Sequence, residues 1–241
     1  MMKNHYFISD IHLGLETKEV EKNKEKILVD FLHGIKDKAD SLYIVGDLYD
    51  YWFEYRKVYQ KGFFRTLNAL YSLTHAGVKV YYVIGNHDFM HRDFFEKEIG
   101  VVLVPDSISP EIEGKKFFIA HGDGYVENDG GYKVLKKILR NKFLQQIYSL
   151  IHPDIGIWLA SGTSKKSRNH TSKKDYGEAD GLFTSAKGYI DLGYDFVVFG
   201  HLHQKQFRNY KTGTYLNLGS WIDKPCYGIF ANNQFEIKDL D

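Results

Sequence analysis

The sequence predicts an α/β fold. Three observations support this: short apolar strands alternate with amphipathic helical segments in the first half, short strands separated by turns follow one another at the end, and polar clusters recur just after the strands. The stretch of about 130–180 carries no strand signal. We therefore expect one domain, 1–241, in which this stretch is a helical insertion between two strands.

The predicted strands are short runs of β-branched and aromatic residues, each ending at a glycine and a polar cluster. They comprise residues 6–9, 42–45, 78–84, 117–120 and 196–199. Apolar residues at helical spacing predict one helix around Ile27, Phe31 and Ile35 and another at 64–73, which Gly77 ends. The C-terminal part predicts antiparallel strands at 205–209, 215–218, 228–231 and 235–237.

The composition excludes several classes of protein. A net charge of +1 lacks the strongly basic character of a nucleic-acid-binding domain, so no nucleic acid partner is expected. The single cysteine, Cys226, cannot form an internal disulfide. Asp10 and His12 fall where a signal peptide needs an uninterrupted apolar segment, and no later run is long enough to span a bilayer. We expect a cytoplasmic protein.

Residues able to bind a metal follow nearly every predicted strand. They occupy five loops: Asp10 and His12, then Asp47, then Asn86, then His121, and finally His201 and His203. Because ligands of α/β sheets bind at the carboxyl ends of the strands, these loops are expected to converge. In the first and last loops a single apolar residue separates the two polar ones, so both can point the same way from extended backbone.

The donor set contains oxygen and nitrogen but no thiolate, which favours Mn²⁺, Fe, Zn²⁺ or Co²⁺. Seven ligands are too many for one ion that keeps a position open for water, whereas two ions about 3.5–4 Å apart can share one carboxylate. Asp47 is the expected bridge, and the expected cofactors are two divalent ions, with Mn²⁺ preferred. Each residue alone could simply form a turn at a strand end, but five such loops together favour a metal site.

The motifs D-x-H, G-D, G-N-H-D, H-G-D and G-H-x-H occur in this order within residues 6–220, and the chain thereby resembles the calcineurin-like metallophosphoesterase superfamily. The resemblance implies a sandwich of two β-sheets flanked by helices. It also implies two metal sites, one formed by Asp10, His12, Asp47 and His203 and the other by Asp47, Asn86, His121 and His201. His87 then corresponds to a histidine that contacts the scissile phosphate, and Asp88 to the residue that orients it.

Further motifs resemble those of the UDP-2,3-diacylglucosamine hydrolases of lipid A biosynthesis, which release UMP and 2,3-diacylglucosamine 1-phosphate. The motifs are D-L-Y-D-Y-W at 47–52, H-G-D at 121–123 followed by N-D-G-G-Y at 128–132, and a basic helical insertion. Substrate contacts are implied at Asn86, His87, Asp129, Ser164, Lys165, Arg168 and His201. His87 replaces the arginine of the best-known members, and Arg168 stands where asparagine is usual. A close but distinct branch therefore stays open.

The insertion contains a basic amphipathic helix. Apolar residues recur at helical spacing from Tyr132 to Leu150, lysines and arginines occupy other positions, and no acidic residue lies between Gly131 and Pro153. Such a helix can bind an anionic membrane surface, or it can pack on its own domain with a solvated basic face. In the first case it is a lid over acyl chains, on an enzyme bound peripherally to the cytoplasmic face of the inner membrane. Oligomeric state is not predicted.

Together these features predict a metal-dependent hydrolase of UDP-2,3-diacylglucosamine. Two other functions stay open: a soluble phosphodiesterase or nucleotide pyrophosphatase without a lipid substrate, and a non-catalytic binding scaffold on the same fold. The intact ligand set argues against the scaffold. The apolar face of the insertion favours the lipid substrate, because a water-soluble nucleotide needs no apolar lid.

Overall fold

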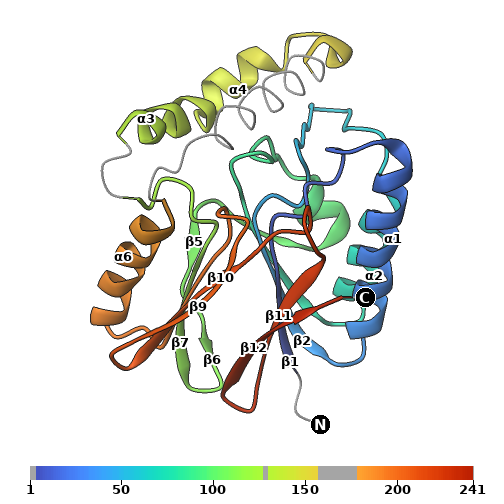
Figure 1. The fold of residues 1–241 in the computed structure, drawn as a ribbon. Helices are drawn as coiled ribbons and strands as arrows, with labels where there is room; N and C mark the ends of the chain where they lie inside the picture. Colours follow the sequence, from blue (N-terminus) through green and yellow to red (C-terminus); the bar gives the residue numbers. More distant parts are fainter. Residues whose placement is uncertain (1–3, 127–129, 157–177, 241) are drawn as a thin grey trace.

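The computed structural model describes residues 4–126, 130–156 and 178–240. In this part of the chain, two six-stranded β-sheets face each other and helices cover their outer faces (Figure 1). The first sheet has the strand order β12-β11-β1-β2-β3-β4, and the second has the order β5-β7-β8-β10-β9 with β6 beside β7. The predicted α/β sandwich of two sheets is confirmed.

The first sheet is mostly parallel. Its parallel strands are β1 (Asn4–Ile8), β2 (Ala39–Val45), β3 (Lys79–Val83) and β4 (Val102–Val104). Two antiparallel strands, β11 (Cys226–Ala231) and β12 (Gln234–Asp239), extend it beyond β1. Helices α1 (Lys18–Ile35) and α2 (Phe64–His75) cover its outer face, and the short π-helix η1 (Phe95–Ile99) precedes β4.

The second sheet also has a parallel centre. Strands β7 (Lys115–Ala120), β8 (Phe196–Phe199) and β10 (Gly213–Leu218) run parallel. Three strands pair antiparallel with this centre: β5 (Ser107–Ile108) and β6 (Glu111–Ile112) with β7, and β9 (Lys205–Tyr210) with β10. Helix α6 (Glu178–Asp191) covers the outer face of this sheet.

Alternating side chains of the central strands divide the core into layers. On β1, Phe7 points between the sheets, where its ring lies 6.0 Å from that of Phe117 on β7. Its neighbours Tyr6 and Ile8 point outward and pack with α1 and α2. Because both faces of these strands are buried, they are apolar runs, and each fully buried large side chain contributes about 1.5–3 kcal/mol.

Helices α3 (Gly130–Leu139) and α4 (Lys142–Tyr148) lie across one end of the sandwich (Figure 1). The chain leaves the helical conformation between them at Asn141. The side chain of Asn141 accepts hydrogen bonds from the backbone of Phe143 and Leu144 and so caps the start of α4. The insertion is therefore helical over residues 130–148, while 157–177 lie outside the described residues. Its role as a lid stays a prediction. None of the described helices is both long and apolar enough for a bilayer span.

Candidate metal centre

All seven predicted metal ligands follow the carboxyl end of a strand, as expected. They come from both sheets: Asp10 and His12 follow β1, Asp47 follows β2, Asn86 follows β3, His121 follows β7, and His201 and His203 follow β8. Because the sheets face each other, these loops meet at the shared end of the sandwich, beneath α3 and α4. Convergence therefore requires both sheets, and not the edge of one sheet alone.

Five of these residues have a left-handed backbone conformation that is rare outside glycine, so the extended backbone expected for the pairs in the first and last loops is wrong. The φ angles of Asp10, His12, Asp47, His201 and His203 are 53°, 49°, 52°, 70° and 57°. Each such left-handed residue costs roughly 1–3 kcal/mol, and residues of this kind cluster at functional sites. The surrounding sandwich therefore holds five loop residues in strained positions that turn their side chains toward a common point.

Two glycines allow the loops to approach one another. A Cβ atom on Gly85 would collide with the carboxylate of Asp47, and one on Gly200 would collide with Ser9 and with the carboxylate of Asp10. Only glycine lacks this atom. The glycines that precede Asn86 and His201 are thus needed for close contact between neighbouring loops, in addition to any turn they make.

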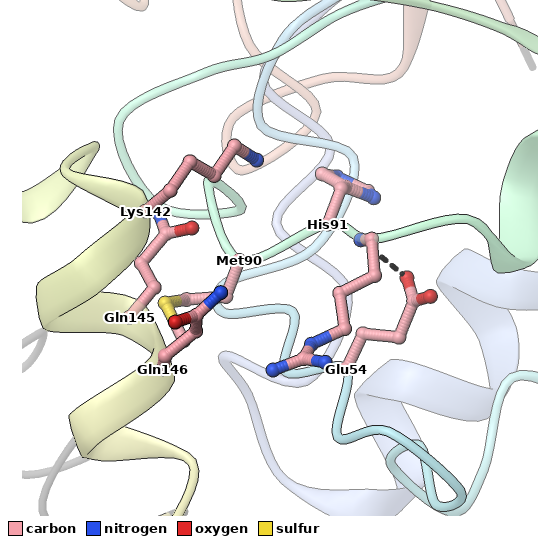
Figure 2. Close-up of a pocket in the computed structure, with 7 residues that line it drawn as sticks. Glu54, Met90, His91, Lys142, Gln145 and Gln146 are labelled. Atoms are coloured by element: carbon pink, nitrogen blue, oxygen red, sulfur yellow. Dashed lines mark hydrogen bonds between the residues drawn. The ribbon is translucent and has the colours of Figure 1, made fainter.

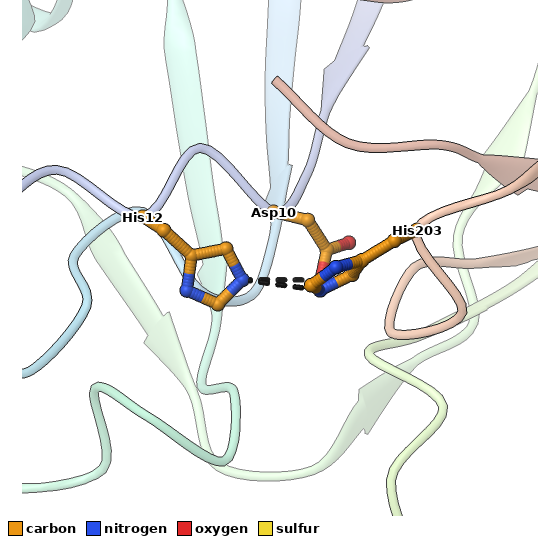
Figure 3. Close-up of side chains that lie close together, drawn as sticks. All are labelled: Asp10, His12 and His203. Atoms are coloured by element: carbon orange, nitrogen blue, oxygen red, sulfur yellow. Dashed lines mark hydrogen bonds and ion pairs between the residues drawn. The ribbon is translucent and has the colours of Figure 1, made fainter. Parts of the chain in front are cut away.

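The first donor group consists of Asp10, His12 and His203 (Figure 3), whose ligand atoms all lie within 4.8 Å of one another. The Nε2 atoms of His12 and His203 are 3.2 Å apart, and Asp10 Oδ1 lies 3.3 Å from Nε2 of His203. The other carboxylate oxygen of Asp10 accepts hydrogen bonds from Ser9 Oγ at 2.5 Å and from the backbone N–H of His201 at 2.9 Å. One oxygen is thus anchored, while buried Oδ1 has no hydrogen-bond partner among the described residues and is available to a metal.

A second donor group lies on the other side of Asp47. Asp47 Oδ2 is 3.7 Å from Nε2 of His12 and 3.3 Å from Nε2 of His121, so it lies between the two groups. His121 Nε2 is also 3.0 Å from Asn86 Oδ1, and the rings of His121 and His201 are 5.2 Å apart. His121 Nδ1 lies 2.8 Å from the carbonyl oxygen of Val45, the kind of contact that orients a ligating imidazole.

The electrostatics of the site favour a bound cation. Despite their burial, nearby histidines hold the pKa values of Asp10 and Asp47 well below the usual range, so both are carboxylates. Burial lowers the pKa of His12, but the nearby carboxylates of Asp10, Asp50 and Asp47 outweigh it and raise the value to about 9. Burial and the neighbouring His121 lower the pKa of His201 to about 4, so its ring is neutral. Although burial lowers the pKa of His121, the carboxylates of Asp47 and Asp10 raise it to about 10, so without a metal the buried carboxylates are balanced by protons on His12 and His121. A divalent ion would take the place of these protons, since a histidine must be neutral to bind metal.

His87 lies beside the first donor group, and its ring nitrogen also lies within 4.8 Å of ligand atoms of His12 and Asp47. Its ring is 4.9 Å from that of His12, and its backbone N–H donates to Asp47 Oδ1 at 2.9 Å. Its Nδ1 lies 3.1 Å from the carbonyl oxygen of Asp50 and 3.7 Å from the Asp50 carboxylate. Asp50 was not singled out from the sequence, although it stands within the D-L-Y-D motif three residues after Asp47. The structure thus gives His87 a neighbouring carboxylate.

Asp88 connects two loops of the site. Its carboxylate accepts hydrogen bonds from the backbone of Leu48 at 2.8 Å and Gly85 at 3.0 Å, and from the hydroxyl of Tyr82. It is fully buried, and burial together with Asp47 raises its pKa to about 6. These contacts hold the loop after β3 against the loop after β2. The expected orientation of His87 by Asp88 stays a prediction.

The remaining predicted substrate contacts cannot be placed, because Asp129, Ser164, Lys165 and Arg168 lie outside the described residues. Two residues missed by the sequence analysis connect α3 to the site. Asp123, of the H-G-D motif, is buried and contacts Lys136 and Arg140 of the insertion. Arg140 also contacts the backbone just before Asn86. A basic residue in a predicted amphipathic helix gives no sign of such a distant partner.

A pocket of about 160 Å³ lies between α4 and the segment that follows Asp88 (Figure 2). It is lined by Glu54, Met90, His91, Arg92, Lys142, Gln145 and Gln146. Glu54 is buried and accepts the backbone N–H of Arg92 at 2.9 Å, and Arg92 Nη2 donates to Ser149 Oγ beyond α4 at 3.3 Å. The ring of Tyr148 packs 4.9 Å from that of Phe53. Helix α4 thus packs against the core through Tyr148 and leaves a pocket between itself and the segment after Asp88.

The family model for calcineurin-like phosphoesterases matches residues 5–205, which include every proposed metal ligand. The chain belongs to the calcineurin-like phosphoesterase family. As a member of this family it is a metal-dependent phosphoesterase, and its clustered donors are consistent with divalent metal binding. The predicted resemblance is confirmed.

Curated relatives of this phosphoesterase match most or all of its length. A protein of Porphyromonas gingivalis described as UDP-2,3-diacylglucosamine hydrolase is 31% identical over 261 residues, covering 100% of this chain and 99% of the relative. Proteins of the same description from Yersinia pseudotuberculosis and Haemophilus influenzae are 30% and 28% identical and cover 94% and 91% of this chain, and 95% and 91% of their own length. A solved archaeal phosphodiesterase shares the fold, with a TM-score of 0.51, 15% identity, and coverage of 98% of this chain and 99% of that one.

Proposed function

We propose that this phosphoesterase hydrolyses the diphosphate of UDP-2,3-diacylglucosamine to UMP and 2,3-diacylglucosamine 1-phosphate. The description of the relatives, which match over almost their whole length, supports this substrate. The observation that carries it in this chain is the exposed apolar surface of α3 and α4, next to a phosphoesterase centre. A soluble nucleotide has no use for such a surface, whereas an acylated sugar does.

That surface consists of exposed apolar side chains on α3, on α4 and just after α4. Its exposed members are Val134, Leu135, Ile138, Leu139, Phe143, Leu144, Ile147 and Leu150. Phe143 is 68% exposed and Leu150 is 85% exposed, and exposed apolar side chains that gather on one surface usually mark a site that contacts a partner, ligand or membrane. We propose that it receives acyl chains and contacts the inner membrane from the cytoplasmic side. Each buried methylene would contribute about 0.8 kcal/mol.

We propose Asp10, His12, Asp47 and His203 as ligands of one ion and Asp47, Asn86, His121 and His201 as ligands of the other, with Mn²⁺ as the preferred metal. The mixed oxygen and nitrogen donors support this choice. When bound, two such ions acidify a shared water and offset the charge that develops on the phosphoryl oxygens. The protein contributes the fixed geometry, because the strained loops hold the donors in place before metal binds.

In the proposed reaction, water attacks the phosphorus on the nucleotide side. His87, at the rim of the first donor group, stabilises the attacked phosphate or protonates the leaving oxygen. Its contact with Asp50 supports a fixed ring orientation for this role. Asn86 and His201 are proposed to contact the substrate phosphate in addition to metal, and Asp129, Ser164, Lys165 and Arg168 to bind the sugar and phosphates.

A substrate panel tests the proposal. Purified protein with Mn²⁺ is assayed on UDP-2,3-diacylglucosamine beside ADP-ribose, a cyclic nucleotide and p-nitrophenyl phosphate esters. We expect the highest kcat/KM on the acylated substrate, with UMP as a product. A preference for ADP-ribose or the cyclic nucleotide would instead identify a soluble phosphodiesterase or nucleotide pyrophosphatase.

A further inference from the structure

Helix α3 turns some of its polar side chains toward the protein and leaves its apolar ones exposed. Tyr132, Lys136 and Arg140, spaced four residues apart, are partly buried, whereas Leu135 and Leu139 are 47% and 38% exposed. Residues four apart lie on one face of a helix, so these three form an inward stripe. A surface helix usually has the reverse arrangement. Something beneath α3 must therefore bind polar and basic groups.

Two carboxylates lie beneath this stripe. Lys136 Nζ contacts Asp123 Oδ2 at 3.0 Å and Asp106 Oδ1 at 2.9 Å, and the hydroxyl of Tyr132 donates to Asp123 Oδ2 at 3.0 Å. The side chain of Asp123 is 2% exposed, and a buried carboxylate is costly unless it is paired and hydrogen-bonded. Asp123, two residues after the proposed ligand His121, thus accounts for the inward orientation of the basic face.

Arg140 extends this contact to the metal-binding loop. Its guanidinium lies 3.5 Å from Asp123 Oδ2, and Nη2 donates to the carbonyl oxygens of Ile84 at 3.0 Å and Gly85 at 3.1 Å. Gly85 packs against the Asp47 carboxylate, and the next residue is Asn86. One planar group from the insertion therefore fixes two carbonyls immediately before a proposed metal ligand.

We infer that Arg140 is a positioning residue for the metal centre: from the end of α3 it holds the Gly85–Asn86 backbone in place, so that this part of the insertion belongs to the active site. The inference rests on the proposed metal ligands and does not depend on the lipid substrate. Substituting a residue that contacts a metal ligand, without binding the metal itself, commonly lowers metal affinity or activity by about 10–100-fold. Substituting Arg140 should therefore weaken metal binding even though Arg140 touches no ligand side chain in the described contacts.

The test compares metal binding and turnover in Arg140→Ala and its parent. Mn²⁺ binding to the chelated proteins is measured by isothermal titration calorimetry, and kcat and KM are measured on bis-p-nitrophenyl phosphate, a small soluble substrate. We expect Arg140→Ala to bind the weaker Mn²⁺ ion about tenfold less tightly and to lose kcat about tenfold or more at fixed metal, with KM within about twofold. Parent-like metal binding in a folded Arg140→Ala protein would overturn the inference.

Two further variants separate positioning from general stability. Lys137→Ala removes the same charge from an exposed site on α3 and should behave as the parent in both assays. Arg140→Lys keeps the charge beside Asp123 but lacks the planar fork that reaches two carbonyls, so it should show an intermediate loss. Equal losses in Arg140→Ala and Lys137→Ala, or a parent-like Arg140→Lys, would overturn the role. If Arg140→Ala does not fold, Arg140→Lys decides the question by the same measurements.

Because the assay substrate carries no lipid, the two proposals fail separately. Inactivity of the parent on UDP-2,3-diacylglucosamine would contradict the proposed substrate and leave the Arg140 result unaffected. An unaltered metal affinity in the Arg140 variants would remove the positioning role and leave the substrate in place.

Discussion

At the scale of single residues, Asp47 occupies the position on which the site depends most. One of its oxygens accepts the backbone N–H of His87, and the other lies between His12 and His121. A carboxylate so placed can bind an ion on each side, whereas Asn86 borders one donor group. Deletion of these two side chains should therefore have unequal effects.

Asp47→Ala should lose both metals and nearly all activity, whereas Asn86→Ala should retain one metal and more residual activity. Chelation of the parent should also abolish activity, and Mn²⁺ should restore it best. Metal content by elemental analysis and turnover of bis-p-nitrophenyl phosphate provide the measurements. Two equivalents of metal in Asp47→Ala, or undiminished activity after chelation, would contradict the bridging assignment.

His87 is expected to act on the substrate and not on metal. His87→Ala should lower kcat by about 10²–10⁴-fold, the usual contribution of general acid–base catalysis, and should leave both metals bound. His87→Arg introduces the residue that the resemblance to UDP-2,3-diacylglucosamine hydrolases implies at this position and is a useful companion variant. Loss of one metal from His87→Ala would show that the histidine is a ligand.

The metal-capable residues could be predicted from the sequence because each directly follows a strand, and strand ends are visible in the apolar pattern. The residues that contact and position these metal-capable side chains could not be predicted. Asp88 binds Leu48, forty residues away, and Asp50 lies beside His87 across a similar separation. Such contacts depend on how the loops pack, which local periodicity does not encode. The left-handed backbone of the ligands is equally invisible in their residue types.

At the scale of elements, α3 illustrates what periodicity determines. The spacing of apolar and basic residues predicts one amphipathic helix from Tyr132 to Leu150, whereas the structure has two, α3 and α4, because Asn141 caps the start of α4. Periodicity gives no information on which face turns inward, because either face can pack if a suitable partner exists. The buried carboxylate of Asp123 selects the basic face. Very short strands such as β5 and β6 were not predicted, since two residues show no alternation.

The outward apolar face of α3 gives a prediction at this scale. Leu135→Asp combined with Leu139→Asp should sharply lower kcat/KM for UDP-2,3-diacylglucosamine, because charged side chains cannot shelter acyl chains from water. Turnover of bis-p-nitrophenyl phosphate should stay near the parent value, since both leucines point away from the metal centre's contacts. Equal losses on both substrates would show that the helix serves only the structure.

At the scale of the whole molecule, the sandwich places buried aromatic layers directly behind the site. His91 lies in one of them, with its ring 5.0 Å from Tyr82 and 5.1 Å from Phe95. Burial and the charge of Lys142 lower its pKa to about 3, so the folded protein keeps it neutral. In the unfolded chain the same ring takes up a proton below about pH 6.5. Its effect on stability therefore depends on pH.

Acid should destabilise the folded protein through His91, because the pKa of its ring is lower in the folded state than in the unfolded state. Between pH 6.5 and 3 the unfolded state binds one more proton at His91, so the free energy of unfolding should fall by about 1.4 kcal/mol per pH unit on acidification. In His91→Phe this contribution is absent. The free energy of unfolding is measured by urea titration of the chelated proteins at pH 7 and pH 5. From pH 7 to pH 5 the parent should lose about 2 kcal/mol more of this free energy than His91→Phe does. Parallel pH profiles would contradict a buried neutral histidine.

The most direct test of the central claim is hydrolysis of UDP-2,3-diacylglucosamine in ¹⁸O-enriched water, with the products analysed by mass spectrometry. With Mn²⁺ bound, we predict UMP that carries one ¹⁸O atom and 2,3-diacylglucosamine 1-phosphate that carries none, because water attacks the phosphorus on the nucleotide side. After chelation neither product should form. Label in the sugar phosphate, or no turnover by the metal-loaded protein, would contradict the proposed reaction.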